Sequence, residues 1–227
     1  MVFVVTSNNK QFERHLNNVA LRELPFATAV ALTKTAKAIQ SAEQRAMKRQ
    51  LDRPKPFTLK SMRIIPAKKS SLSATILFKD TATAGGAPAG RYLRPQVLGG
   101  SRRLKRFEKA LIGMGAMRTN EFAVPGRRAR LNSFGNVSNA LIKNVLTSIR
   151  SKGGQFFVPS DRSTLPRGVY QRMARKKLKL IFVFVTDDPD YRKRYDFVGV
   201  ARKTAMKAFP GIHRAEFTKA IANSRFL

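Results

Sequence analysis

The sequence predicts an α+β fold in which a long N-terminal helix packs across a small antiparallel β-sheet, with further helices in the middle and at the C-terminus and long irregular loops. Three observations predict it: a helical pattern of small residues near the N-terminus, a pair of alternating segments after it, and two more helical patterns later in the chain. The chain has 227 residues, of which 43% are hydrophobic. This length and composition suit a single domain, residues 1–227, with a core of its own.

The first long element is a helix expected between Phe12 and Leu51, after a short strand at Val2–Val5. The dipeptide Leu24-Pro25 can interrupt this helix, and the prolines of Asp52–Pro56 end it, because proline cannot continue a helix. Small side chains would let the helix lie close to a flat partner such as a sheet. They recur every three or four residues along one face, at Ala20, Leu24, Ala27, Ala31, Ala38, Ala42 and Ala46.

A β-hairpin is expected next, built from the segments "KSMRIIPA" and "LSATILFK", which are joined by "KKSS". In the second segment Leu72, Ala74, Ile76 and Phe78 occupy alternate positions, which is the period of a half-buried strand. Extended loops are expected at about 80–103 and at 113–136, where glycine, proline and other small or polar residues are frequent.

The remaining elements are predicted from the spacing of apolar residues and from one long apolar run, "LKLIFVFV". Two amphipathic helices and two strands precede a helical C-terminal segment that is interrupted at Pro210-Gly211. In chain order they are expected at Ser101–Leu111 (helix), Val137–Ser151 (helix), Gln155–Val158 (strand), Lys177–Asp188 (strand) and Tyr195–Leu227 (helix).

The chain is strongly basic, with 45 Lys and Arg against 13 Asp and Glu and a formal net charge of +32. Such a field attracts polyanions, so nucleic acid or an acidic protein surface is the expected partner. No membrane is expected as a partner, since no basic amphipathic segment carries a Trp anchor. Four basic runs stand out: Arg102, Arg103, Lys105 and Arg106; Arg127, Arg128 and Arg130; Arg172, Arg175, Lys176 and Lys177; and Arg192, Lys193 and Arg194.

Catalytic motifs are not found in the sequence, and neither a cofactor nor a metal is expected. Gly99-Gly100 precedes a helix but lacks the spacing of a phosphate-binding loop or of a dinucleotide fingerprint. The absence of cysteine excludes disulfides and thiolate chemistry. His15 and His213 lie far apart in the chain. A metal-dependent nuclease stays open as an alternative at Asp187, Asp188 and Asp190, although these residues are also typical of a turn.

Several segments resemble the minor tail protein Z-like, or tail completion, proteins of tailed bacteriophages. The resemblance covers most of the chain from about Leu21 onward, and none of its motifs is catalytic. It is carried by "LPFATAVALTKTA" (Leu24–Ala36), "RPKPFTLKSMRI" (Arg53–Ile64), "YLRPQVLGGSRRLKRFEKAL" (Tyr92–Leu111), "AVPGRRARLNSFGNVSNALI" (Ala123–Ile142) and "LPRGVYQR" (Leu165–Arg172).

The resemblance implies a structural virion protein of the phage neck or upper tail, assembled in the host cytoplasm. It implies a homo-oligomeric ring of six or twelve copies that completes the tail and joins it to the head. The implied partners are portal, connector or adaptor proteins, tail tube or hub proteins, and the packaged double-stranded DNA. The basic charge of this chain exceeds what the family leads us to expect, which favours contact with DNA or with acidic neighbours.

The order of residues in the segment Tyr92–Leu111 suggests a loop that docks on a neighbouring subunit. Gly99 and Gly100 would permit a sharp turn, and the apolar residues before them would pack at the contact: Tyr92, Leu93 and Pro95. Arg102, Arg103 and Arg106 would then face DNA or an acidic neighbour. The alternative function is a general nucleic-acid-binding protein, ribosomal or nucleoid-like, that holds phosphates without reading the base sequence.

Overall fold

The computed structural model describes residues 10, 13–14, 17, 19–79, 87–187 and 190–223, and it confirms the predicted α+β fold. The chain divides into two compact units where the sequence predicted one domain. Unit 1 is formed by residues 1–51, 56–91 and 195–227, and unit 2 by residues 52–55 and 92–194. The expected strand at Val2–Val5 lies outside the described residues.

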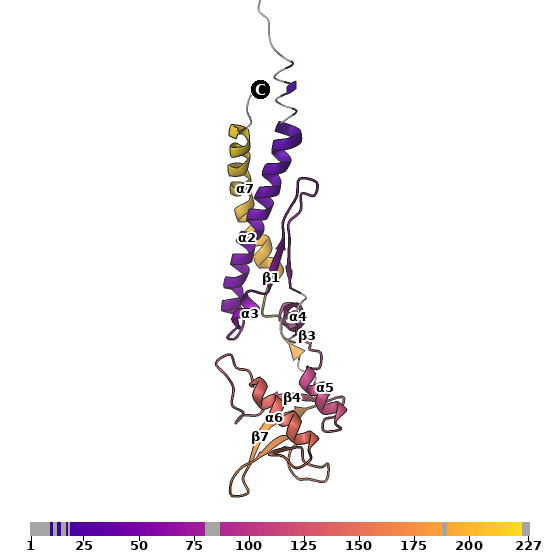
Figure 1. The fold of residues 1–227 in the computed structure, drawn as a ribbon. Helices are drawn as coiled ribbons and strands as arrows, with labels where there is room; N and C mark the ends of the chain where they lie inside the picture. Colours follow the sequence, from indigo (N-terminus) through magenta and orange to yellow (C-terminus); the bar gives the residue numbers. More distant parts are fainter. Residues whose placement is uncertain are drawn as a thin grey trace, which may run out of the picture. The chain divides into compact units, whose positions relative to one another are not determined.

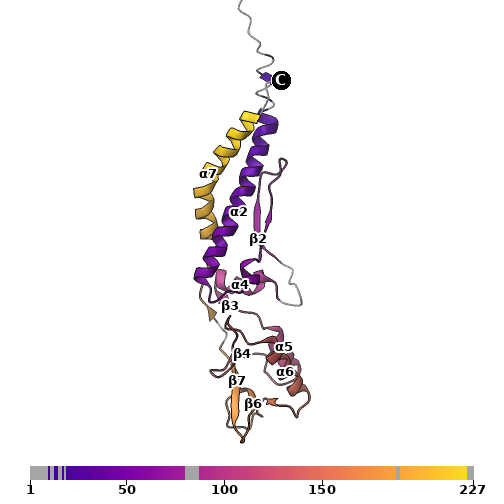
Figure 2. The same cartoon turned by 60° about the vertical axis from the view of Figure 1, so that its left-hand side comes forward.

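Unit 1 is built on two long helices that run antiparallel (Figures 1 and 2). A π-helical turn, η1 (Val19–Glu23), leads into α2 (Leu24–Gln50), and α7 (Phe197–Asn223) packs along α2. The Leu24-Pro25 interruption is therefore the junction of η1 with α2, and the proline lies in the first turn of α2. Proline is tolerated there because an N–H in the first turn has no intrahelical partner.

Helix α2 packs along α7 as well as against a small antiparallel sheet, so it has a helix as a partner in addition to the sheet that the sequence predicted. Ala27, Ala31 and Ala46 are buried, as their spacing predicted, whereas Leu24 is exposed at the start of the helix. The side chain of Ala20 is outside the described residues, and Ala38 and Ala42 are half-buried. Small side chains let helix axes approach closely, which suits a second helix as well as a sheet.

The predicted hairpin is confirmed and lies against α2. Strand β1 (Met62–Ile65) pairs antiparallel with β2 (Thr75–Phe78), and a short helix, α3 (Pro56–Leu59), precedes it. The Gln40 side-chain amide donates to the Met62 carbonyl at 3.2 Å, and the Ala67 amide donates to the Thr33 hydroxyl at 3.1 Å. The long helix therefore lies across a small antiparallel sheet, as the sequence predicted.

Helix α7 continues through Pro210-Gly211, so the interruption predicted there is wrong. Pro210 is exposed, and the helix is anchored beyond it. His213 shares a 3.2 Å hydrogen bond with Thr28, and Glu216 forms a 2.7 Å ion pair with Lys34. These contacts with α2 hold the second half of α7 in place of the backbone hydrogen bond that proline cannot donate.

Unit 2 contains a four-stranded antiparallel sheet in the order β4-β7-β6-β5. The strands are β4 (Phe122–Pro125), β5 (Phe156–Phe157), β6 (Gly168–Arg172) and β7 (Leu178–Val185). Two helices, α5 (Arg106–Gly113) and α6 (Asn139–Arg150), share a core with the sheet. Phe107 on α5 and Phe182 on β7 meet at the centre of this core, with ring centroids 4.8 Å apart.

Both long loops predicted from the sequence contain regular structure. Within 80–103, the residues from Ala89 to Leu98 form helix α4, while 80–86 lie outside the described residues. Within 113–136, β4 pairs with β7. Strand β6 was not predicted from the sequence, because a glycine and polar residues obscure its pattern. Helix α5 begins later than expected because Gly100–Ser101 form β3, which pairs with β8 (Asp190–Tyr191).

Candidate polyanion-binding surface

The turn between β6 and β7 carries the third basic run of the sequence. The last strand pair is Arg172 with Leu178, and the turn is closed where the Lys177 amide donates to the Ala174 carbonyl at 3.4 Å. The two central residues, Arg175 and Lys176, both have positive φ, at 56° and 59°. Both side chains are exposed, so two cations occupy the tip of the hairpin.

The second basic run is brought next to this hairpin by the pairing of β4 with β7. Pro125 pairs with Phe182, and the Gly126 amide then donates to the Ile181 carbonyl at 2.8 Å. A Cβ at residue 126 would lie 2.8 Å from the Leu180 carbonyl oxygen, so only glycine allows this close approach. A surface hollow results, lined by Arg127, Arg128, Tyr170, Leu178 and Leu180.

Two runs that are more than 40 residues apart in the sequence therefore form one basic region. We call it the hairpin surface and define it by six exposed cations: Arg127, Arg128, Arg172, Arg175, Lys176 and Lys177. Lys179 lies between Leu178 and Leu180 on β7, so its side chain points to the opposite face of the sheet and is not part of this surface. Arg130, which was predicted with this group, is exposed two residues beyond Arg128.

Arg172 is the cation of the hairpin surface whose orientation is fixed by contacts with the rest of unit 2. Its guanidinium lies over the Phe157 ring, 4.1 Å from the centroid, and donates to the Gly154 carbonyl at 2.8 Å. A cation held over an aromatic ring is stabilised and loses part of its side-chain freedom before any ligand binds. Arg172 remains exposed and can still contact an anion.

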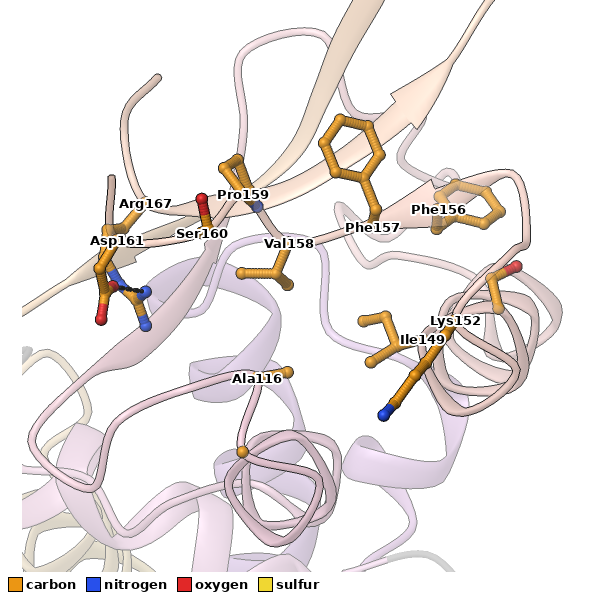
Figure 3. A pocket seen from close by; sticks show the side chains of 12 residues that line it. Ala116, Ile149, Lys152, Phe156, Phe157, Val158, Pro159, Ser160, Asp161 and Arg167 are labelled. Atoms are coloured by element: carbon orange, nitrogen blue, oxygen red, sulfur yellow. Dashed lines mark hydrogen bonds and ion pairs between the residues drawn. The ribbon is translucent and has the colours of Figure 1, made fainter. Parts of the chain in front are cut away.

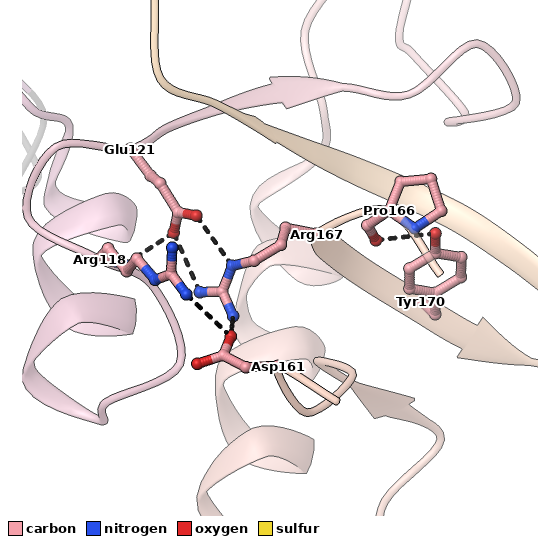
Figure 4. A network of polar contacts seen from close by, with 6 residues as sticks. All are labelled: Arg118, Glu121, Asp161, Pro166, Arg167 and Tyr170. Carbon is pink, nitrogen blue, oxygen red and sulfur yellow. Dashed lines mark hydrogen bonds and ion pairs between the residues drawn. The ribbon is translucent and has the colours of Figure 1, made fainter. Parts of the chain in front are cut away.

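Carboxylates are scarce around these cations. No Asp or Glu lies between Glu121 and Asp161 or between Asp161 and Asp187. Unit 2 as a whole has 25 Lys and Arg against 7 Asp and Glu. Glu121 and Asp161 are themselves engaged: Arg167 donates to Glu121 at 2.8 Å and to Asp161 at 2.6 Å (Figure 4). The cations of the hairpin surface therefore have no Asp or Glu near them in the sequence.

Arg102 has an internal role, which corrects its assignment as a contact for DNA or for an acidic partner. It donates two hydrogen bonds to Glu108, at 2.7 and 2.5 Å, and its guanidinium lies 5.1 Å from the centroid of the Phe122 ring. Glu108 is fully buried and also accepts from the Lys105 and Ala123 amides, at 2.6 and 3.0 Å. The pair thus ties the start of α5 to β4.

The other residues of the first basic run stay exposed but lie at the opposite end of β4 from Arg127. They are Arg103, Lys105 and Arg106. The fourth run adjoins this group rather than the hairpin surface, because β8 pairs with β3 and the Arg194 amide donates to the Gln96 carbonyl at 2.9 Å. The four runs therefore form two separate groups. The first and fourth runs make up one group, which also contains the carboxylates of Glu108 and Asp190, and the second and third runs make up the hairpin surface.

The predicted docking loop is largely helical, and part of it is buried. Leu93 and Pro95 lie inside the folded chain, so they are not available to a neighbouring subunit, whereas Tyr92 is 38% exposed. Gly99 and Gly100 have φ of 78° and 83°, and they provide the sharp turn between α4 and β3. The turn prediction is confirmed, and the more exposed apolar residue of this segment is Leu98.

A second pocket of unit 2 lies between the end of α6 and the strand β5 (Figure 3). Its volume is about 370 Å³, and Ile149, Phe157 and Val158 provide apolar walls. Arg167 also lines it but is paired with Asp161, so the pocket presents only modest free charge. We assign no ligand to it.

The acidic cluster of the nuclease alternative is only partly described. Asp187 is exposed, Asp190 pairs with Ser101 in the β3–β8 ladder, and Asp188 lies outside the described residues, as does His15. Among the residues that the structure describes, no group of three or more His, Cys, Asp or Glu could hold a metal ion. Within the same residues, no helix is long and apolar enough to cross a bilayer.

The sequence analysis did not anticipate a buried polar pair in unit 1. Glu43 on α2 and Tyr195, two residues before α7, are both fully buried, and the Tyr195 hydroxyl donates to the Glu43 carboxylate at 2.6 Å. Burial raises the pKa of Glu43 to about 7 against the effect of this hydrogen bond, and Asp196 adds to the rise. A Glu within an alanine-rich helix face gives little indication of burial from sequence alone.

No protein-family model matches the chain, and no curated protein or solved structure matches it either. The resemblance to tail completion proteins therefore remains a prediction from the sequence.

Proposed function

We propose that this protein is a non-catalytic structural component of a tailed-phage virion, located at the neck or upper tail. There it completes the tail and joins it to the portal, connector or adaptor proteins of the head and to the tail tube or hub. The observation that carries the proposal is the resemblance of five segments to tail completion proteins. Those segments belong to both units, including α2 in unit 1 and the stretch from β4 to α6 in unit 2.

Exposed apolar side chains on unit 1 support an assembly role. Leu21, Val198 and Met206 are 76%, 61% and 73% exposed, although they belong to helices that otherwise pack on each other. Large exposed apolar side chains are typical of surfaces that a partner covers. In the proposed ring of six or twelve copies, neighbouring subunits or tail proteins would cover them.

The charge of the chain places a condition on this assembly. At +32 per copy, subunits repel each other until anions offset the charge. DNA in the channel, or acidic surfaces of neighbouring proteins, would supply those anions. The proposal therefore includes assembly of the ring on its neighbours rather than ring formation by isolated subunits.

Immunogold labelling of purified virions tests the location. Antibodies raised against the full chain should label the junction of head and tail, once per particle. Labelling of the capsid or the distal tail tip, or a protein missing from purified virions by mass spectrometry, would contradict the proposal.

The hairpin surface favours a second candidate, a general nucleic-acid-binding protein that holds phosphates without sequence readout. The two candidate functions differ in whether the protein assembles with connector or tail proteins when no nucleic acid is present. A neck protein forms a closed ring with connector or tail proteins in the absence of nucleic acid, whereas a nucleoid-like protein would assemble only along DNA or RNA. Negative-stain electron microscopy of nuclease-treated mixtures distinguishes them.

A further inference from the structure

We propose that the hairpin surface of unit 2 is a binding site for the phosphate backbone of double-stranded DNA and does not read the base sequence. The inference deepens the proposed function, on which it rests for the source of the DNA, the genome in the neck channel. The inference distinguishes between the basic runs of the sequence: the cations at 127–128 and 172–177 bind DNA, and Arg102 does not.

The backbone at the hairpin tip provides the first argument. Positive φ at both central residues is the arrangement of a type I′ turn, which strongly prefers Asn-Gly because side chains with a Cβ are strained there. This turn has Arg175 and Lys176 instead, with φ of 56° and 59°. Two cations thus occupy the positions where the fold alone would favour small turn residues. Strain kept at an exposed site indicates that the side chains serve something other than folding.

The same pattern recurs elsewhere in unit 2. Among the described residues, four that are not glycine have positive φ, and all four are Lys or Arg: Arg53, Lys152, Arg175 and Lys176. Asn and Asp are the residues that ordinarily enter this conformation. Only Arg175 and Lys176 are adjacent, so the strain is concentrated at the hairpin tip.

The chemistry of the six side chains favours phosphates as the ligand. Four are arginines, whose planar guanidinium groups bind phosphate oxygens through two parallel hydrogen bonds. Arg172 is held on Phe157 before binding, which reduces the entropy lost when it contacts an anion. Lys and Arg are among the side chains that most often contact phosphate oxygens, and such contacts position a protein on the duplex without carrying sequence information.

An acidic protein is the competing ligand, and the structure favours it less. A stable protein interface has an apolar centre that loses its water, surrounded by a polar rim. The tip of the hairpin instead presents three exposed cations in a row: Arg175, Lys176 and Lys177. The exposed apolar side chains of the hairpin, Met173 and Leu178 at 46% and 41%, lie on either side of these cations in the sequence rather than forming a centre. Such a surface gains binding energy by releasing counterions from a polyanion of regular charge spacing, as duplex DNA provides.

A four-fold variant tests the proposal with the full-length protein and a random-sequence duplex of about 30 base pairs, a length within the span of protein–DNA contacts. It combines Arg127→Gln and Arg128→Gln with Arg175→Asn and Lys176→Gly. The last two changes give the turn its preferred sequence, so loss of binding cannot be ascribed to unfolding. The matched control removes four exposed cations from α7 in unit 1: Arg202→Gln, Lys203→Gln, Lys207→Gln and Arg214→Gln.

Fluorescence anisotropy at several salt concentrations gives the result. We expect the hairpin variant to bind the duplex at least about tenfold more weakly at 100 mM salt, and the control within about twofold of the unchanged protein. The slope of log K against log salt should fall by about 3 in the hairpin variant, which corresponds to three or four lost phosphate contacts. Thermal denaturation should show an unchanged or higher Tm.

Two results would overturn the proposal. An equal loss of DNA affinity in both variants would mean that binding depends on the net charge of the protein rather than on this surface. Binding of poly-glutamate that is tighter than binding of the duplex, with the same dependence on the hairpin cations, would assign the surface to an acidic protein. Neither result depends on virion location, so DNA binding through the hairpin surface by a protein absent from the neck would leave this proposal standing while contradicting the proposed function.

Discussion

Tyr195 and Glu43 form the polar contact that links α2 to the start of α7 inside unit 1. Their oxygens are 2.6 Å apart, and neither side chain is exposed. One carboxylate oxygen of Glu43, Oε1, has no hydrogen-bond partner among the described residues. A buried carboxylate with one unsatisfied oxygen is costly when charged, which is the physical reason for its raised pKa.

This contact predicts that unit 1 loses stability as pH rises. The folded-state pKa of Glu43, about 7, exceeds its ordinary value of 4.5. Its contribution is therefore fully present below pH 4.5 and is lost as pH rises through 7, by about 3 kcal/mol at most. Glu43→Gln keeps the shape of the side chain but removes its ionisable group. The free energy of unfolding of this variant should therefore not fall with pH on account of residue 43, and it should exceed that of the unchanged protein at pH 8.5. Urea denaturation at pH 5, 7 and 8.5 measures this difference, and equal pH slopes would contradict the assignment.

Tyr195→Phe should destabilise unit 1 more at high pH than at low pH. Removing the hydroxyl leaves the Glu43 carboxyl group without its hydrogen-bond donor, which costs about 1–3 kcal/mol for a buried group. The cost should be larger at pH 8.5, where the carboxyl group is charged, than at pH 5. Tyr170→Phe provides a comparison, because Tyr170 donates to the Pro166 carbonyl rather than to a carboxylate. A pH-dependent cost in Tyr170→Phe as well would argue against a specific role of Glu43.

Arg102→Ala should destabilise unit 2, whereas Arg103→Ala should not. Although burial opposes ionisation, hydrogen bonds from Arg102 and two backbone amides hold the pKa of Glu108 below its ordinary value. The stabilisation from Glu108 is thus present above pH 4.5 and lost as pH falls. Truncating Arg102 leaves a buried carboxylate uncompensated, at a cost of about 3 kcal/mol near neutral pH. The exposed neighbour should cost less than about 0.5 kcal/mol.

The comparison of these two arginines uses thermal denaturation of the full-length protein at pH 7 and pH 4. Similar losses for both would mean that the Arg102–Glu108 pair carries no special weight. A loss for Arg102→Ala that persists undiminished in acid would mean that its packing on Phe122 matters more than its charge.

The turn substitution Arg175→Asn with Lys176→Gly should raise the free energy of unfolding of unit 2 by about 1–2 kcal/mol. The gain comes from glycine, which has no Cβ, at position 176 and from asparagine, which tolerates the left-handed region better than arginine, at position 175. As a control, the same pair of residues placed at Arg127 and Arg128, where no positive φ is found, should give no gain. A destabilised turn variant would show that the tip is not strained, which would remove one argument for its role in binding.

Local patterns were enough to predict much of the fold. The spacing of Ala27, Ala31 and Ala46 located α2 and its buried face, and alternation around Ile76 located the hairpin. The apolar run from Leu178 located β7. In each case burial follows the period of one element, so the information lies within a single stretch of chain.

What could not be predicted depends on residues that are distant in the chain. Pro210 stays within a helix because side chains of α2 hold the second half of α7 in place. Arg102 is not free to bind a partner because it forms an ion pair with the buried Glu108, which also contacts β4. The hairpin surface exists because β4 pairs with β7, which brings Arg127 beside Leu178. Composition showed that the chain is basic, but the grouping of its cations required the sheet register.

Electron microscopy of particles from a phage unable to make this protein tests the central claim most directly. If the protein completes the tail and joins it to the head, filled heads should accumulate beside unattached or unfinished tails, and complementation should restore joined particles. Intact, infectious virions with normal necks would contradict the account.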